Sequence, residues 1–125
     1  MLKALILALL IVLVGIVSNK SHAGDSWDKT DKVLATGAVG LLIVDWGQTR
    51  YIAKNPEKHS EMNPILGDHP SVGRVDAYFA LATLGTIALA EILPRDYRKL
   101  FLSGVIGLEL GVVARNHHLG IRVAF

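Results

Sequence analysis

Long apolar segments constrain the fold of this chain more than any other feature. Three of them, at residues 33–53, 75–93 and 100–117, approach the length of about 20 residues that a helix needs to cross the hydrocarbon core of a bilayer. A segment in lipid must satisfy its own backbone hydrogen bonds, which an α-helix does. The sequence therefore predicts an all-α membrane protein with three transmembrane helices.

A fourth apolar segment, from Ala4 to Val17, lies at the N-terminus and is too short to span a bilayer. Lys3 precedes it, and a polar stretch ending in Ser21-His22-Ala23 places small residues where signal peptidase requires them. We predict that residues 1–23 are an N-terminal signal peptide that is cleaved, which leaves residues 24–125 as one three-helix domain. The alternative is an uncleaved N-terminal anchor.

The composition agrees with a membrane protein. Hydrophobic residues make up 51% of the 125 residues, charged residues only 19%, and the mean hydropathy is +0.41. A soluble chain of this length would need more polar surface to cover its core. The formal net charge is only +2, and no basic stripe with interleaved aromatics occurs, so nucleic acid is not an expected partner. The absence of cysteine excludes disulfides and thiolate ligands.

The signal peptide sets the expected orientation. A translocated N-terminus leaves the mature N-terminus in the periplasm, residues 54–74 in the cytoplasm, and residues 94–99 as a tight polar turn outside. Lysine and arginine divide almost evenly between the two sides, so they add little to this assignment. We predict a multi-pass protein of the bacterial inner membrane with a cytoplasmic C-terminus and the lipid bilayer as its partner.

Polar residues interrupt the first predicted span on one helical face. Asp45, Gln48 and Thr49 stand at positions i, i+3 and i+4, which share a face. A carboxylate at this depth costs roughly 2.5–3.5 kcal/mol on insertion scales, so it is expected to face the bundle interior and to have a partner there. Two interpretations stay open: a hydrogen bond between helices, or contact with a ligand or ion.

The other two spans carry polar residues of their own. Asp76 begins the second span, and Glu109 and Asn116 lie two turns apart on one face of the third. Gly107 and Gly111 form a GxxxG step that permits close approach of another helix, so a homo-oligomer or a partner membrane helix is a further expectation.

The loop between the first two spans contains the most distinctive local motif, Glu61-Met62-Asn63-Pro64-Ile65-Leu66-Gly67. Asn63 before Pro64 favours an extended or turn conformation, and Gly67 can adopt the positive φ that ends a turn. Glu61 can accept hydrogen bonds from exposed amides in the turn. The Ile65-Leu66 pair indicates that the loop packs back against the bundle, either as a purely structural element or as part of a ligand site.

Four histidines are candidate metal ligands, namely His59, His69, His117 and His118. Their chemistry suits zinc or iron. However, His117 and His118 are adjacent and point about 100° apart on a helix, and no HExxH or ExxH spacing is present. The more ordinary interpretation is interfacial or solvated histidine, and no cofactor is identified. Nucleophilic catalysis has no GxSxG motif to support it.

The predicted topology gathers these polar residues at one membrane face. The end of the first span, the loop, the start of the second span and the end of the third all meet on the cytoplasmic side. A polar pocket there is the main functional prediction. Its candidate ligand-binding residues are Asp45, Gln48, Thr49, Glu61, Asn63, Asp76, Glu109 and Asn116.

The pair of motifs Asp45-Trp46-Gly47-Gln48-Thr49 and Glu61-Met62-Asn63-Pro64 resembles small uncharacterised bacterial and phage inner-membrane families with an Asp-x-x-x-Thr and Glu-x-Asn-Pro pattern. The resemblance covers roughly residues 41 to 93. Those families have no established activity, so the resemblance implies membership and no chemistry.

Three functions are compatible with the sequence. The first is a non-enzymatic inner-membrane protein whose pocket binds an ion, a small ligand or a partner helix. The second is a phage-type holin or antiholin that forms membrane lesions, which size, three short spans and a glycine-bearing third span favour. The third is a metal-dependent membrane enzyme, which three helices can barely enclose. The first requires the fewest features beyond those present, so a non-enzymatic role is the expectation.

Overall fold

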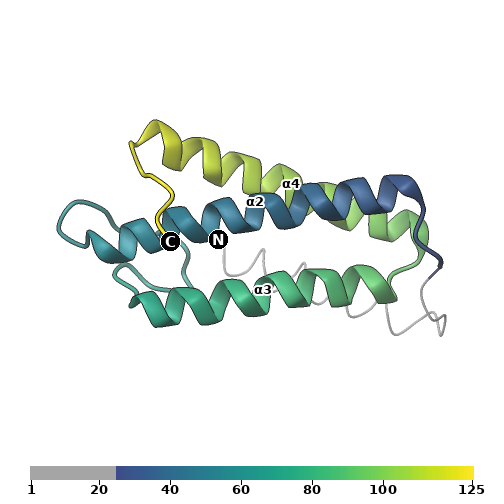
Figure 1. The fold of residues 1–125 in the computed structure, drawn as a ribbon, viewed down its shortest axis with the longest axis horizontal. Helices are drawn as coiled ribbons and strands as arrows, with labels where there is room; N and C mark the ends of the chain where they lie inside the picture. The colour runs from purple at the N-terminus through teal and green to yellow at the C-terminus, as the bar shows by residue number, and fades with distance from the viewer. Residues whose placement is uncertain (1–24) are drawn as a thin grey trace.

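The computed structural model describes residues 25–125, and the predicted signal peptide at residues 1–23 lies outside this range. The described part is all-α and contains three helices, α2 (Lys29–Lys54), α3 (Val72–Ile92) and α4 (Arg95–His118) (Figure 1). The prediction of an all-α chain with three helices is confirmed.

Helix α2 begins four residues before the predicted span because its N-terminus is capped. The Asp28 side chain accepts a hydrogen bond from the Asp31 amide at 2.8 Å, and the Asp31 carboxylate accepts one from the Asp28 amide at 3.0 Å. This reciprocal capping box satisfies two amides that have no partner within the helix. Lys54 in the last turn suits the negative end of the helix dipole.

Helix α3 begins after Ser71, whose hydroxyl accepts a hydrogen bond from the Arg74 amide at 3.2 Å. It ends at Ile92, two residues before Pro94, whose ring cannot continue a helix from the preceding turn. The predicted polar turn at residues 94–99 is wrong, because α4 already begins at Arg95 with Pro94 at its N-cap. The charged residues that indicated a turn instead form the first turn of α4.

Helix α2 packs against both other helices, whereas α3 and α4 meet mainly near the short turn that joins them and diverge toward the opposite end (Figure 1). Near that turn, Ala35 and Ala38 of α2 pack with Ala90 and Leu102. At the opposite end, a second apolar cluster forms from Leu66 of the loop and Val75 and Phe79 of α3. The core is therefore thin and divided between the two ends.

One helix, α3, is long and apolar enough to cross a membrane among the residues described. Only 17% of its most apolar segment is buried inside the protein. Helix length and hydropathy therefore support one possible span, α3, and do not show the three that were predicted. Asp45 and Arg50 interrupt α2, and Glu109 and Arg115 interrupt α4.

Residues 119–125, here called the tail, fold back from α4 across α2 (Figure 1). The Ala124 amide donates to the Gly47 carbonyl at 3.0 Å, and the Phe125 ring meets the Trp46 ring edge-on at 5.9 Å. A Cβ atom on Gly47 would clash with Val123 and lie 2.8 Å from the Phe125 ring. Glycine at this position therefore permits the close approach of the tail.

Candidate functional site: polar residues between the helices

Asp45 of α2 and Glu109 of α4 face one another in the bundle. Each residue is only 8% exposed, and their carboxyl groups share a hydrogen bond. Two carboxyl groups can share such a bond only if one of them carries a proton. The Thr49 hydroxyl donates to Asp45 Oδ1 at 3.3 Å. Glu109 Oε2 is buried, and no N–H or hydroxyl group within residues 25–125 donates to it.

One turn further along, Gln48 and Asn116 join the same two helices. Gln48 Nε2 donates to the Val113 carbonyl at 3.3 Å, and Asn116 Nδ2 donates to Gln48 Oε1 at 3.2 Å. Both ends of the Gln48 amide are therefore bonded to α4. Asp45, Gln48, Thr49, Glu109 and Asn116 are all buried, and we call these five residues the polar interior.

The loop, residues 55–71, places Glu61 near this interior. The Glu61 carboxylate lies within electrostatic range of Asp45. It accepts a hydrogen bond from the Asn63 amide at 2.9 Å, as the turn motif predicted. Burial raises the pKa of Glu61, while the bonds from the Asn63 and Met62 amides and the positive charge of Arg115 oppose that rise.

The loop is anchored to the bundle by its apolar side chains and its turn. Leu66 is buried, whereas its neighbour Ile65 is exposed, so one member of the predicted pair packs inward. Gly67 has a φ of +82°, which confirms the turn predicted there. The Asn63 side chain hydrogen-bonds to Tyr78, which also lies within electrostatic range of both buried carboxyl groups. The loop therefore brings polar groups to the polar interior.

Asp76 has a different environment from the other candidate residues. It accepts hydrogen bonds from the Arg50 guanidinium and, at 2.7 Å, from the Trp46 indole. Arg50 Nε also donates to the Ala124 carbonyl at 3.2 Å. Asp76 thus joins α2, α3 and the tail, and its contacts are those of a structural ion pair rather than those of the polar interior.

The four histidines are not brought together. His59 packs beside the Tyr51 ring with centroids 5.7 Å apart, and His69 and His118 are exposed. Among residues 25–125, no group of three or more His, Asp or Glu side chains is arranged to hold a metal ion.

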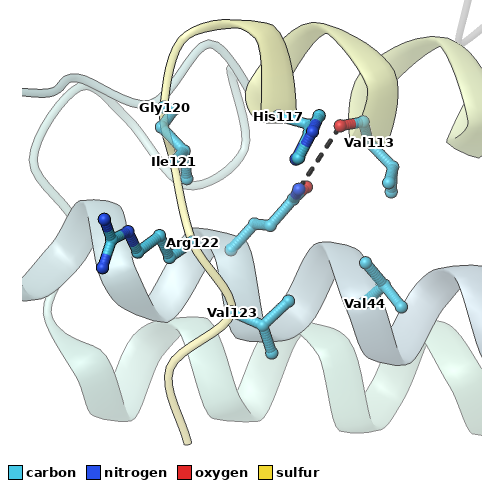
Figure 2. A pocket seen from close by; sticks show the side chains of 8 residues that line it. Val44, Val113, His117, Gly120, Ile121, Arg122 and Val123 are labelled. Carbon is cyan, nitrogen blue, oxygen red and sulfur yellow. Dashed lines mark hydrogen bonds between the residues drawn. The ribbon is translucent and has the colours of Figure 1, made fainter.

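A pocket of about 480 Å³ lies beside Gln48, between α2, α4 and the tail. Figure 2 shows Val44 of α2, Val113 and His117 of α4, and Val123 of the tail around it, together with the hydrogen bond to the Val113 carbonyl. Its lining is mainly apolar, with Gln48 and His117 as polar groups and Arg122 from the tail.

A second charged cluster, at the opposite end of the bundle, was not expected from the sequence. Arg98 and Asp31 form an ion pair at 3.0 Å with both side chains fully buried. Arg98 also donates to the Ala90 and Leu93 carbonyls at 2.7 and 3.1 Å and lies over the Trp27 ring. Lys99 completes the cluster by pairing with Asp28 and Asp31 at 2.7 and 2.8 Å.

A sequence signal for this second cluster did exist. The start of the first predicted span and the start of the third lie at the same end of an up-down-up bundle. Acidic residues precede the first span and basic residues precede the third, so charge complementarity across that end could have been predicted.

Comparison with protein-family models gives no match, and neither do comparisons with curated proteins and with solved structures. The resemblance to small inner-membrane families therefore stays a prediction. Function must be inferred from the residues and their geometry.

Proposed function

We propose that the chain is a small multi-pass inner-membrane protein of non-enzymatic type, whose polar interior binds an ion, a small ligand or a partner helix. The observation that carries this proposal is the pairing of the polar residues of α2 with those of α4. Asp45 bonds to Glu109 and Gln48 bonds to Asn116, so the residues that lower the hydropathy of these helices lie inside the bundle.

The outward faces of the helices support the same proposal. Large apolar side chains are exposed along all three helices, as expected of positions that face lipid. The core helix of a soluble protein would be mostly buried, but α3 is not. The exposed apolar residues include Val33 and Ile43 of α2, Leu81 and Leu84 of α3, and Leu100, Leu108 and Leu110 of α4.

The proposed orientation places the loop and the tail in the cytoplasm and the Asp31–Arg98 cluster at the periplasmic face. It can be tested with single cysteines, because the natural chain has none. A thiol reagent that cannot cross membranes should label Asp96→Cys in intact spheroplasts. It should label Ser60→Cys and Arg122→Cys only after the membrane is opened.

Carbonate extraction provides the control for integration, and the full chain should stay in the membrane pellet. Release of the chain by carbonate would overturn the membrane proposal. Labelling of all three cysteines from one side would overturn the three-span topology while leaving membrane association intact.

A holin-like function is the second candidate, favoured by one observation. Gly104, Gly107 and Gly111 of α4 have open space where a side chain would lie, as far as residues 25–125 are concerned. Residues 25–125 therefore do not use the GxxxG step, which leaves it open to a second copy of the chain. Strong expression should then collapse the membrane potential abruptly, and Gly107→Leu should prevent the collapse. Continued growth with an intact potential would exclude this candidate.

A further inference from the structure

The two polar pairs that join α2 and α4 differ in how completely they are satisfied. The Gln48 amide is bonded through both its nitrogen and its oxygen. In contrast, Glu109 presents a buried oxygen, Oε2, that no N–H or hydroxyl group within residues 25–125 reaches, so its satisfaction depends on a proton shared with Asp45. An unsatisfied carboxyl oxygen in an apolar bundle is costly. An amide side chain such as Gln48 joins α2 and α4 without a buried charge. The presence of two carboxyl groups at Asp45 and Glu109 therefore needs an explanation other than helix pairing.

Other oxygen-bearing side chains lie on the elements around this pair, and one of them contacts it directly. Thr49 contributes a hydroxyl from α2, Tyr78 of α3 lies within electrostatic range of both carboxyl groups, and Glu61 approaches from the loop. The positive charge of Arg115 of α4 acts on Glu61. Carboxylate and hydroxyl oxygens are the ligands of hard cations.

The charge of the pair decides which cation fits. With one shared proton, the two carboxyl groups carry a net charge of −1. Exchange of that proton for a monovalent cation leaves the net charge unchanged, so the cost of burying charge is not increased. Calcium requires six to eight oxygen ligands and magnesium requires octahedral geometry with several retained waters. Two carboxyl groups and the Thr49 hydroxyl supply fewer oxygens than either ion takes.

We propose that the Asp45–Glu109 pair is an exchange site for one proton or one alkali cation, with sodium coordinated by both carboxylates when the proton leaves. This inference rests on the proposed function and identifies the ligand class of the polar interior. Glu61, at the loop, is the group through which the ion would reach the pair.

A carbodiimide tests the proposal without any assay of activity. An apolar carbodiimide such as dicyclohexylcarbodiimide adds a protonated carboxyl group in an apolar site and rearranges to a stable N-acylurea, which mass spectrometry locates. Purified full-length protein in detergent should be modified once, at Asp45 or Glu109. Sodium chloride should protect it, while choline chloride at the same ionic strength should not. Potassium chloride, as a third arm, tests selectivity among alkali cations.

The expected size of the sodium protection follows from mass action. At ten times the half-protective sodium concentration, the labelling rate should fall about tenfold. Asp45→Asn and Glu109→Gln should each abolish the sodium-sensitive adduct. Glu91→Gln, an exposed carboxyl at the other end of α3, is the matched control and should label as the natural protein does. Circular dichroism establishes that each variant is folded.

Three results would overturn the proposal. They are the absence of an adduct on the folded natural protein, an adduct that sodium does not slow, and equal protection by choline. The last two show a buried acid without a cation site. Because the measurement uses detergent-solubilised protein, its failure is distinct from failure of the membrane proposal, which the carbonate extraction tests separately.

Discussion

At the scale of single residues, the buried ion pair Asp31–Arg98 differs from the Asp45–Glu109 pair because it joins opposite charges and because Arg98 has several further hydrogen-bond acceptors. The Arg98 guanidinium donates hydrogen bonds to two carbonyls at the end of α3, to the Asp31 carboxylate and to the Asp25 carbonyl. Trp27 covers the guanidinium face. This arrangement ties the start of α2 to the turn between α3 and α4, so it fixes the end of the bundle at which all three helices converge.

Asp31→Asn should destabilise the protein strongly, because it leaves the fully buried Arg98 charge without its partner. Breaking a buried pair from one side costs about 3 kcal/mol or more, although the amide oxygen of the variant would keep one hydrogen bond. Unfolding by denaturing detergent, followed by circular dichroism, measures the loss. Glu57→Gln in the exposed part of the loop should change the free energy of unfolding by less than about 0.5 kcal/mol. Equal stability of the two variants would contradict a structural role for the pair.

The same carboxylate predicts an acid dependence of stability. Burial acts to raise the pKa of Asp31, but hydrogen bonds from Lys99, the Asp28 amide and Arg98 outweigh it and lower the pKa from 3.8 to about 2. A lowered folded-state pKa means that this contribution is complete above pH 3.8 and is lost as the pH falls toward 2. The natural protein should therefore lose stability in that window. Asp31→Asn should show a flatter profile there, and an identical slope would contradict the assignment.

At the scale of elements, the end of the tail is held by two positions of α2, Gly47 and Arg50. Gly47 accepts a hydrogen bond from the Ala124 amide and leaves room for Val123 and Phe125. Arg50 fixes the same segment through the Ala124 carbonyl and holds Asp76 of α3. The far end of the tail, and with it one wall of the pocket beside Gln48, is therefore docked on α2, whereas its first residues stay hydrogen-bonded to α4 through the Ile121 amide and the Asn116 carbonyl.

Gly47→Ala should release the tail without unfolding the helices. The added methyl group would clash with Val123, so the Ala124 amide loses its acceptor and should exchange with deuterium faster. Hydrogen exchange of the C-terminal peptide, read by mass spectrometry, measures this. Gly40→Ala on the same helix meets open space and should leave tail exchange unchanged while gaining up to about 1 kcal/mol in helix stability. Similar exchange in both variants would show that Gly47 does not control the tail.

At the scale of the whole molecule, hydrophobic length was enough to predict three helices and their approximate bounds. Helical spacing also brought Asp45, Gln48 and Thr49 to one face, and the structure places Glu109 and Asn116 against that face. Spacing could not reveal that residues 95–99 would be helical, because charged residues after a proline also suit a turn. It could not reveal the docking of the tail either, since this depends on a tertiary contact with Gly47.

Hydropathy selects α3 alone, among residues 25–125, as a possible span, although three spans are proposed. Hydropathy averages over all faces of a helix. In the bundle, the polar residues of α2 and α4 are buried against each other and leave mainly apolar faces outside. Insertion of these two helices should therefore depend on the rest of the chain. In an insertion assay with reporter fusions, the isolated segment 72–92 should span the membrane and the isolated segment 95–118 should do so poorly.

Glu109→Leu should restore insertion of the isolated segment 95–118, because a carboxylate near the middle of a span costs roughly 2.5–3.5 kcal/mol that no partner offsets there. In the full chain, where Asp45 is present, α4 should insert with Glu109 unchanged. Ser103→Leu, at an exposed position of α4, is the matched control and should improve insertion of the isolated segment much less. Efficient insertion of the unaltered segment by itself would show that pairing with α2 is not what carries α4 into the membrane.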